Sequence, residues 1–593
     1  MRKRFLFVFL ILGFGCSSPA QPSSTSGRGG GSGGTGPGAG GSGGSGGSGA
    51  STGGSSATGG SGTGGGSGSG GSTGTTGAGG RAVTGSGGNS GSGSGGTGGA
   101  SSAGASVLER NNHPSRDGHF VQPALGKTAA GKMAQDTSFN AAYTGSVLGS
   151  PLYFSSGPGG QGIFVVVTSG NDVYALDETT GATVWTKNLG MPAGKSGASG
   201  GCDGIQPLGV ISTPVIDGRT GTLYVAGAIG DANGITSHSV WALSLQDGSI
   251  KSGYPVDVSK ALGFPPTTHN QRGALSLVGN ILYVPYGGHT GDCVVDMHGR
   301  VVAIDTSANP PVVKGWQSAG QGEAIWAPAG MASAGDGVFA TTGNRFTTTG
   351  DHNDSEEVAH VRGMGTLDKG TGSKDFFFPS DWKTKDQRDF DMGAVNPVLV
   401  TLPGSTGPAL IVTSKDGNGF ILDSADLSKG PLATFDVTMQ GMNVRSVPTA
   451  YVSGSTVFYA IAVDSAWANC PNGTANGSVL MAFALSPSLP LKPAVAWCAT
   501  YGLVPKGTDE VTFWGGPGAP GLIATTTDGT NDALVWYMDG GKQLVALDGA
   551  TGATVFRDTA ASCGSVRKWT SPIAVKGRIV VAADGKLCSW SPH

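Results

Sequence analysis

The sequence predicts an all-β protein, an eight-bladed β-propeller of four-stranded antiparallel blades, with a seven-bladed ring as the alternative. A pattern of alternating residues, a turn and a second extended stretch occurs twice almost unchanged, as NDVYALDETTGATVW (Asn171 to Trp185) and KQLVALDGATGATVF (Lys542 to Phe556). Weaker copies lie between them at intervals of about 40 to 55 residues, the period of a propeller blade. The last copy stops after its first strands, in residues 570–593.

The chain opens with a signal peptide, residues 1–20. MRKR is a basic start, and FLFVFLILGFG is an apolar run shorter than the ~20 residues that a membrane helix needs. Cys16, which follows Gly15, resembles the lipid-attachment cysteine of bacterial lipoproteins, although the two residues before Gly15 depart from the usual pattern. Ordinary cleavage near Ser18 to Ala20 is the alternative. We expect an exported outer-membrane or cell-surface lipoprotein, periplasmic or extracellular, that contacts the membrane only through its lipid anchor.

Residues 21–105 form a low-complexity linker of Gly, Ser, Thr and Ala, in which Val83 is the one large apolar residue. Such a segment has nothing to bury against the entropy of ordering it, so we expect a flexible coil. Its root-mean-square span is on the order of 50 Å, from ~5–6 Å times the square root of its length. A passive spacer is the first interpretation, and a glycosylated or adhesive stalk is the alternative.

The propeller takes the remaining residues, 106–593. The formal net charge of the whole chain is −3, and no basic run occurs outside the signal peptide. A nucleic-acid partner is therefore not expected.

Three residues define each repeat: Asp177, Gly181 and Trp185 in the first full copy. The aspartate can accept hydrogen bonds from the amides of the turn, and the glycine can take a positive φ without a Cβ penalty. We expect the aromatic ring to fill the space between adjacent blades. The same positions in the last full copy are Asp548, Gly552 and Phe556.

The incomplete last unit lacks an outer strand. Met133 to Tyr143, before the first full unit, is available to supply it. Closing the ring with strands from both ends of the chain removes sheet edges that otherwise invite aggregation.

Cysteines other than Cys16 form an even set, which favours disulfides in an exported chain. No C-x-x-C, C-x-x-C-H or zinc-ligand spacing occurs, so neither haem nor zinc bound through cysteine is expected. The sequence alone leaves other pairings open. Closure within single units predicts the pairs Cys470 with Cys498 and Cys563 with Cys588, which leaves Cys202 to pair with Cys293.

The repeat also carries a resemblance. The pattern A-x-D-x-x-T-G-x-x-x-W, present as Ala175, Asp177, Thr180, Gly181 and Trp185, resembles the repeat of the pyrroloquinoline-quinone (PQQ)-type propellers, the quinoprotein alcohol dehydrogenase-like superfamily. The likeness covers most of the propeller domain and implies an eight-bladed ring. It does not imply quinone binding, because many members keep the blades and lack the cofactor.

The resemblance leaves two functions open. Quinone-dependent members show two adjacent cysteines near the cofactor, a Trp floor, and Glu, Asn and Asp ligands to calcium, whereas this sequence has no adjacent cysteine pair. G-x-S-x-G, H-E-x-x-H and P-loop motifs are also missing from it. We therefore expect a non-catalytic binding or scaffold module at the cell envelope, with a protein or glycan ligand at the propeller face and no cofactor. The alternative is a PQQ-dependent dehydrogenase that oxidises alcohols or sugars.

Polar residues are densest at the boundary of the third and fourth units, and four of the nine histidines lie in or beside this stretch if His352 is included. They flank predicted strands, so we expect them to converge at one rim of the ring. The alternative is that they cap turns and pair with one another. The candidate ligand-binding residues are His269, Arg272, His289, Asp292, His298, Glu323, Trp326, Asn344 and Arg345, and no catalytic residue is predicted.

A short acidic stretch, DHNDSEE, follows this region at Asp351 to Glu357. Carboxylate oxygens at such spacing can hold calcium, although the stretch lacks the Gly and the terminal Glu of an EF-hand loop. The candidate ligands are Asp351, Asn353 and Asp354, and a solvated loop is the alternative.

Overall fold

The computed structural model describes most of residues 105–593. The stretches outside the described residues are 1–104, 195–204, 290–295, 346–349, 439–443, 472, 486–489, 504–517 and 561–562. The expected signal peptide with Cys16 lies outside the described residues, as do the expected linker up to residue 104, Cys202, Asp292 and Cys293. Within the described ranges, no helix is long and apolar enough to span a membrane.

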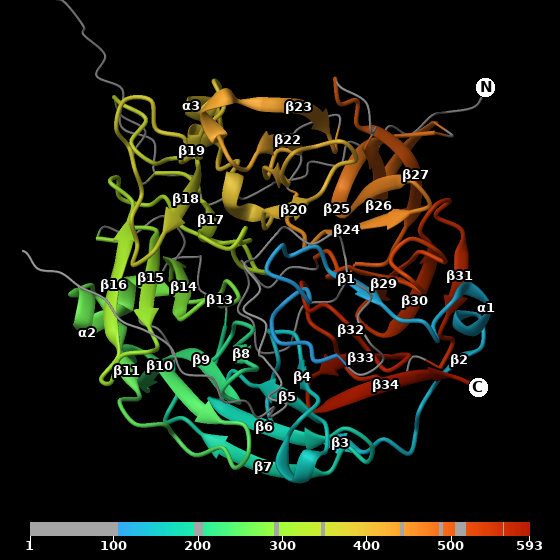
Figure 1. Ribbon diagram of the computed structural model, residues 1–593, viewed down its shortest axis with the longest axis horizontal. Helices are drawn as coiled ribbons and strands as arrows, with labels where there is room; N and C mark the ends of the chain where they lie inside the picture. Colours follow the sequence, from blue (N-terminus) through green and yellow to red (C-terminus); the bar gives the residue numbers. More distant parts are fainter. Residues whose placement is uncertain are drawn as a thin grey trace, which may run out of the picture. The chain divides into compact units, whose positions relative to one another are not determined.

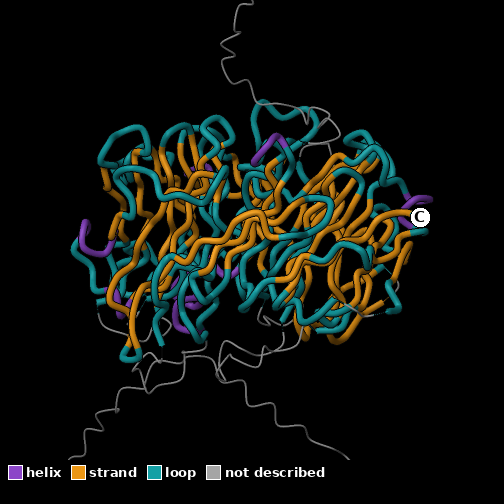
Figure 2. The backbone as a smooth tube through the Cα atoms, turned by 90° about the horizontal axis from the view of Figure 1, so that it is seen from below, coloured by secondary structure: helices purple, strands orange, loops and turns teal. Residues whose placement is uncertain are grey.

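Eight sheets, antiparallel except for one parallel strand pair in blade 7, stand around one axis and follow one another around the ring (Figure 1). The eight-bladed prediction is therefore confirmed, and the seven-bladed alternative is wrong. In blades 1 to 7 the chain begins at the inner strand, beside the axis, and ends at the outer strand. Seen from the side, the strands run between two faces of the ring (Figure 2). We call the face at which the inner strands begin the start face, and the other the opposite face.

The strands of the first four blades are short at the axis and longer in the middle of each sheet. Blade 4 has three strands, and its inner position is held by Ala332, which bridges to Phe339. The strands are β4 (Leu152–Phe154), β5 (Ile163–Val167), β6 (Asp172–Asp177) and β7 (Thr183–Asn188) in blade 1; β8 (Val215–Asp217), β9 (Thr222–Asp231), β10 (Gly234–Ser244) and β11 (Val256–Asp257) in blade 2; β12 (His269–Asn270), β13 (Ser276–Val278), β14 (Ile281–Gly288), β15 (Arg300–Asp305) and β16 (Val312–Gln317) in blade 3; and β17 (Gly337–Thr341), β18 (Val358–Arg362) and β19 (Phe376–Phe377) in blade 4.

Of the other four blades, blades 7 and 8 include strands from the N-terminal part of the domain. The strands are β20 (Val398–Val400), β21 (Ala409–Thr413), β22 (Asn418–Asp423) and β23 (Pro431–Asp436) in blade 5; β24 (Thr449–Ser453), β25 (Thr456–Cys470), β26 (Gly473–Leu485) and β27 (Ala494–Thr500) in blade 6; β1 (His119–Val121), β28 (Ile523–Thr526), β29 (Leu534–Asp539), β30 (Gln543–Asp548) and β31 (Thr554–Arg557) in blade 7; and β32 (Ile573–Val575), β33 (Arg578–Ala583), β34 (Lys586–Pro592), β2 (Met133–Gln135) and β3 (Ala141–Ala142) in blade 8.

Helices are few and short among the described residues. Asp257 caps one of them by accepting a hydrogen bond from the Lys260 amide at 3.0 Å, and Gly263 ends it in the left-handed conformation. The α-helices are α1 (Lys127–Ala130), α2 (Val258–Leu262) and α3 (Trp382–Arg388), and the 3-10 helices are η1 (Pro158–Gly160), η2 (Pro266–Thr268), η3 (Met392–Ala394) and η4 (Leu427–Lys429).

Both well-preserved repeats form the turn that their residues require. Asp177 Oδ1 accepts hydrogen bonds from the amides of Thr179 and Thr180, and Asp548 Oδ1 does the same in blade 7. Gly181 has a φ of 77°, a conformation that favours glycine.

The core is divided among the interfaces between adjacent blades. One buried cluster joins blades 1 and 2 and includes Trp185. Trp185 Nε1 donates to the Leu245 oxygen at 3.0 Å, and a Cβ on Gly248 would lie 2.7 Å from the same indole ring. The tryptophan that ends one blade therefore packs on the turn of the next. Trp497 repeats this arrangement against Gly552.

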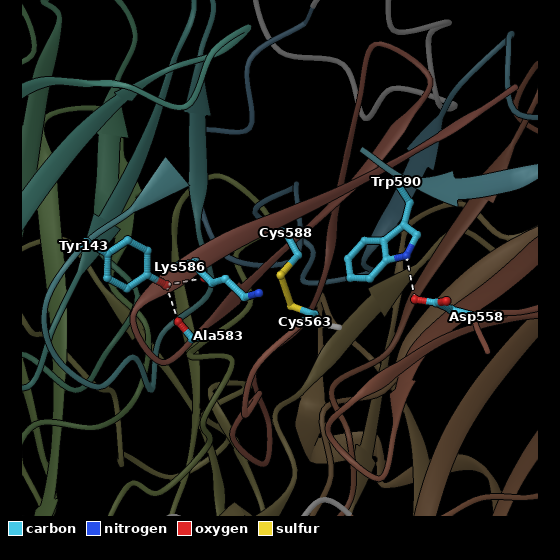
Figure 3. The surroundings of a disulfide bond; sticks show 7 residues. All are labelled: Tyr143, Asp558, Cys563, Ala583, Lys586, Cys588 and Trp590. Atoms are coloured by element: carbon cyan, nitrogen blue, oxygen red, sulfur yellow. Dashed lines mark hydrogen bonds between the residues drawn. A yellow bond between two sulfur atoms is a disulfide. The ribbon is translucent and has the colours of Figure 1, made fainter. Parts of the chain in front are cut away.

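Strands from both ends of the domain close the ring. The predicted stretch Met133 to Tyr143 supplies β2 and β3, which pair with β34. Tyr143 Oη also donates to the Lys586 oxygen at 2.9 Å, close to the disulfide between Cys563 and Cys588 (Figure 3). A second disulfide joins Cys470 to Cys498 in blade 6. These are two of the three expected pairs, and the third lies outside the described residues.

Candidate functional site

The segment Val107–Phe120 crosses the centre of the ring and bonds to the inner parts of the blades, an arrangement that the sequence did not predict. We call it the axial segment. Its main chain bonds to six blades, through Val107 with Tyr153, Leu108 with Ile216, Pro114 with Ser333, Ser115 with Leu399, Asp117 with Ala450, and Gly118 with Ala524.

Two arginines of the axial segment reach the remaining blades. Arg116 Nη2 donates to the Leu275 oxygen at 2.9 Å in blade 3, and Arg110 Nη2 donates to Ser571 Oγ at 3.2 Å in blade 8. The axial segment thus contacts all eight blades. Arg116 also lies 2.9 Å from the carboxylate of Glu109, so its charge is paired.

A pocket lies on the ring axis at the start face, where the axial segment forms part of its wall. Its empty volume is about 500 Å³, including its mouth. The lining residues precede the inner strands of blades 1, 2, 3, 4 and 8, except for Arg110 from the axial segment. They are Arg110, Leu148, Ile205, Ile211, Thr213, Arg272, Pro328, Lys568 and Trp569.

Two tryptophans flank the Arg272 side chain in this region. The guanidinium carbon lies 4.9 Å from the Trp326 ring centroid and 5.5 Å from that of Trp569. Trp569 has a φ of 66°, a left-handed conformation that is uncommon for a bulky residue and is retained where surrounding contacts fix it. The Trp569 indole is held by a bond to the Arg445 oxygen at 3.2 Å.

The structure does not gather the candidate residues into one site. Arg272 lines the axial pocket and Trp326 packs on it, as described above. Glu323, Asn344 and Arg345 lie together in a separate region that is rich in buried carboxylates. Asp292 falls outside the described residues.

The candidate histidines belong to the packing of blade 3. His269 Nε2 lies 3.1 Å from Arg300 Nε, and its Nδ1 lies 2.9 Å from the Pro265 oxygen. Burial, with the charge of Arg300, lowers the pKa of His269 to about 3. His298 Nδ1 lies 3.0 Å from the Ser318 oxygen, and His289 is buried. The described contacts of His269 and His298 are those of residues that hold loops in place.

Buried carboxylates gather between blades 4 and 5 on the start face. Glu323 is fully buried, accepts a bond from the Gly320 amide at 2.8 Å and lies 3.6 Å from Arg345 Nε. Burial, reinforced by the charge of Asp354, raises the pKa of Glu323 to about 7. We call the group the carboxylate cluster: Glu323, Asp354, Glu356, Glu357, Asp386, Asp389 and Asp391.

Asp391 connects the carboxylate cluster to Trp326, the tryptophan that packs on the pocket residue Arg272. Asp391 Oδ1 accepts from the Asn344 amide at 3.2 Å, and its Oδ2 lies 3.0 Å from Lys415 Nζ. A Cβ on Gly343 would lie 2.3 Å from Asp391 Oδ1 and 3.2 Å from Trp326 Nε1, so glycine permits this close approach. Lysine pairing and main-chain bonds satisfy much of the cluster internally.

Two of the three predicted calcium ligands, Asp351 and Asp354, make contacts with other residues of the protein. Asp354 uses one carboxylate oxygen for the Ala319 amide at 2.7 Å and the other for Lys369 Nζ at 2.8 Å. The main-chain oxygen of Asp351 accepts from Arg345 Nη1 at 2.6 Å. Across the described ranges, no group of three or more His, Cys, Asp or Glu residues is arranged to hold a metal ion.

The quinone site that the resemblance implies is matched only in part. Trp326 stands beside the axial pocket, with Asn344 and Asp391 behind it. However, Arg272 covers the Trp326 ring, Lys415 neutralises Asp391, and the sequence has no adjacent cysteines. The described residues therefore do not form the calcium and cysteine parts of such a site.

Sequence reasoning missed Arg110, Lys568 and Trp569. Arg110 lies more than four hundred residues before Lys568 and Trp569 in the chain, and it occupies a stretch without strand periodicity. The one available signal was position, because the stretch before each predicted inner strand points toward the axis of a propeller.

Comparison with known proteins supports the repeat assignment. The family model described as outer membrane protein assembly factor BamB matches residues 133–312. No curated protein sequence matches the chain.

Solved structures of quinoprotein dehydrogenases share the fold. Quinohemoprotein alcohol dehydrogenase from Comamonas testosteroni aligns with a TM-score of 0.54 at 14% identity, covering 82% of this chain and 80% of that one. A europium-containing methanol dehydrogenase aligns with a TM-score of 0.56 at 15% identity, covering 81% and 89%. Identities this low establish the fold alone. The chain is thus an eight-bladed β-propeller, whose repeat and fold are similar to those of the pyrroloquinoline-quinone type.

Proposed function

We propose that this propeller is a non-catalytic binding module that holds a small organic ligand in its axial pocket. The observation that carries the proposal is the pocket itself. It lies on the ring axis and is lined by residues from five blades and from the axial segment. Apolar side chains with a few polar groups line it, as is usual for such sites.

The lining supports binding rather than catalysis. The only hydroxyl among the described lining side chains is that of Thr213, which accepts from Arg110 at 3.1 Å and from the Ser150 amide at 2.9 Å. No carboxylate, imidazole or thiol belongs to this described lining, so it offers no general base for acid–base chemistry.

We further propose that the module works at the cell envelope, tethered through the residues before the propeller. Ser106 Oγ lies 3.0 Å from Ser155 Oγ, just after β4 ends at the opposite face. Leu148, which lines the pocket, lies just before β4 begins. A tether attached at Ser106 is therefore at the opposite face of the ring, whereas the pocket is at the start face.

The proposal is tested by titrating the purified protein with a panel of small aromatic acids, amides and alcohols. Binding is followed by tryptophan fluorescence and thermal shift, because Trp569 lines the pocket. Ile211→Trp fills the pocket and is expected to abolish binding. Ile250→Trp, an exposed position in the same blade, is the matched control and is expected to bind normally. Absence of binding to the wild type, or unchanged binding by Ile211→Trp, would refute the proposal.

A PQQ-dependent dehydrogenase is the second candidate. The observation in its favour is that two tryptophans and three cationic side chains surround the pocket, which suits a flat anionic ring. PQQ, if bound, would supply the redox chemistry, and Arg110, Arg272 and Lys568 would hold it. Titration with PQQ, with and without Ca²⁺, followed by dye-linked oxidation of alcohols or sugars, tests this candidate. Oxidation supports the enzyme, whereas binding without oxidation supports the binding module.

A further inference from the structure

We infer that the axial segment supplies the residue that determines ligand specificity, Arg110, and that the ligand in the axial pocket carries an anionic group. The anionic group is a carboxylate or a phosphate. This inference rests on the proposed binding function and adds the chemical class of the ligand.

The Arg110 guanidinium is buried in the pocket wall and held by neutral acceptors. Its Nε donates to Asn111 Oδ1 at 3.3 Å, its Nη1 to Thr213 Oγ1 at 3.1 Å, and its Nη2 to the Trp569 oxygen and to Ser571 Oγ at 3.2 Å. A guanidinium has five N–H groups. These bonds leave one N–H on Nη1 without an acceptor among the described residues.

No carboxylate pairs with Arg110 in the described part of the chain, in contrast to the buried Arg116 and Arg567. Arg116 lies 2.9 Å from Glu109, and Arg567 lies 2.9 Å from Asp584. Burial and the charge of Arg116 lower the pKa of Arg110 to about 9, as expected for a positive charge without a counter-ion. A buried charge is costly unless it is paired, so an anion at this point of the pocket would be strongly favoured.

The rest of the pocket sets the shape of the ligand. Leu148, Ile205, Ile211 and Pro328 provide apolar walls. A ligand that satisfies both features has an anionic head at Arg110 and an apolar body against these walls. An arginine can bind carboxylate and phosphate alike through charge-assisted hydrogen bonds.

The test uses benzoate, phenyl phosphate and the neutral benzamide as probes of the purified full chain. Charge-assisted bonds are expected to make benzoate or phenyl phosphate bind on the order of ten- to a hundredfold more tightly than benzamide. Arg110→Gln is expected to remove that preference and leave benzamide binding nearly unchanged. Arg110→Lys is expected to retain part of it.

Arg116→Lys is the matched control, because it changes a buried arginine of the same segment that is paired with Glu109 and is not a lining residue. It should keep the preference for the anionic probes. If Arg110→Gln does not fold by circular dichroism, the wild-type preference and its reduction in Arg110→Lys decide the question.

The outcomes separate this inference from the proposed function. Equal binding of benzoate, phenyl phosphate and benzamide by the wild type overturns the anion inference and leaves the binding function intact. Retention of the full preference in both Arg110 variants overturns it as well. If none of the probes binds, the proposed function itself fails. Which of the two anionic probes binds more tightly tells a carboxylate ligand from a phosphate ligand.

Discussion

The carboxylate of Glu109 lies 2.9 Å from Nη1 of Arg116 at the centre of the ring, and both side chains are almost fully buried. Arg116 also donates to the main-chain oxygens of Arg110, Leu275 and Met331. Arg116, paired with Glu109, therefore fixes the axial segment to blades 3 and 4, which lie more than 150 residues later in the chain.

Arg116→Met should destabilise the protein by about 3–5 kcal/mol, because it leaves a buried carboxylate without its partner. Chemical denaturation measures the loss as a lower free energy of unfolding. Arg116→Met combined with Glu109→Gln should recover part of the loss, since no unpaired charge remains. A single variant within ~1 kcal/mol of the wild type would show that the pair does not hold the segment.

The axial segment also marks the limit of what the sequence could predict. The blades were predictable because Asp177, Gly181 and Trp185 recur with a fixed spacing, and the closing strand because the last unit was incomplete. The stretch LERNNHPSRDGHF has no strand period and carries charges typical of a surface loop. Its burial is possible because the blades around it offer main-chain acceptors, and because Glu109 within the segment pairs with Arg116.

Part of the candidate site was predictable from the sequence. Arg272 and Trp326 were found because they lie in one polar region of the sequence. Arg110 and Trp569 reach the pocket only through closure of the ring, and a sequence scan for dense polar stretches passes over them. Glu323 and Asn344 lie at the carboxylate cluster and do not line the pocket. Arg345 contacts Glu323, and Asp391 accepts a hydrogen bond from the Asn344 amide.

The tryptophans between blades should carry a large share of the stability. Trp497 is 3% exposed, and its Nε1 donates to the Gly549 oxygen at 2.8 Å. Trp497→Ala should cost about 3–5 kcal/mol through the cavity that it leaves. Trp497→Phe should cost less, because the ring remains and Tyr451 still donates to the Gly549 oxygen. Thermal unfolding measures both, and Phe556→Ala, at the equivalent but less buried position of blade 7, should cost less than Trp497→Ala.

The disulfide between Cys563 and Cys588 should stabilise the closing blade. It spans 25 residues, for which the chain-entropy argument gives about 3 kcal/mol. Replacing both cysteines by serine should lower the free energy of unfolding by roughly that amount and speed amide exchange in β34. The pair Cys470 and Cys498, with a separation of 28, is the matched comparison and should cost a similar amount without affecting β34. Equal exchange in β34 for both variants would contradict the assignment of the first bond to ring closure.

Acid should weaken the fold through buried neutral histidines. Burial lowers the pKa of His238 to about 4, and in the described structure its Nδ1 has no hydrogen-bond partner. As the pH falls, His238 is therefore protonated near pH 6.5 in the unfolded chain but only near pH 4 in the folded chain. Stability from this residue is complete above pH 6.5 and is lost as the pH falls toward 4, by at most about 1.4 kcal/mol per pH unit.

Unfolding curves between pH 7 and 4 test this expectation. His238→Gln cannot bind the proton, so its loss of stability over that range should be smaller than that of the wild type. Carboxylates contribute to acid sensitivity in both proteins, and the difference between the two curves isolates the histidine. Parallel curves would show that His238 does not contribute.

Alkaline pH should lower the free energy of unfolding through the carboxylate cluster, whereas acidic pH lowers it through His238. Glu357 is fully buried, and burial raises its pKa to about 8, although the contact with Lys369 opposes the shift. The folded protein therefore holds a proton on Glu357 that the unfolded chain has already released, so this stabilisation is complete below about pH 4.5 and is lost as the pH rises through 8. Glu357→Gln keeps the neutral form at every pH, and Lys369 keeps its partner Asp354 at 2.8 Å. The free energy of unfolding of the variant should fall less steeply between pH 6 and 9 than that of the wild type, and equal slopes would mean that Glu357 is already ionised in the folded protein.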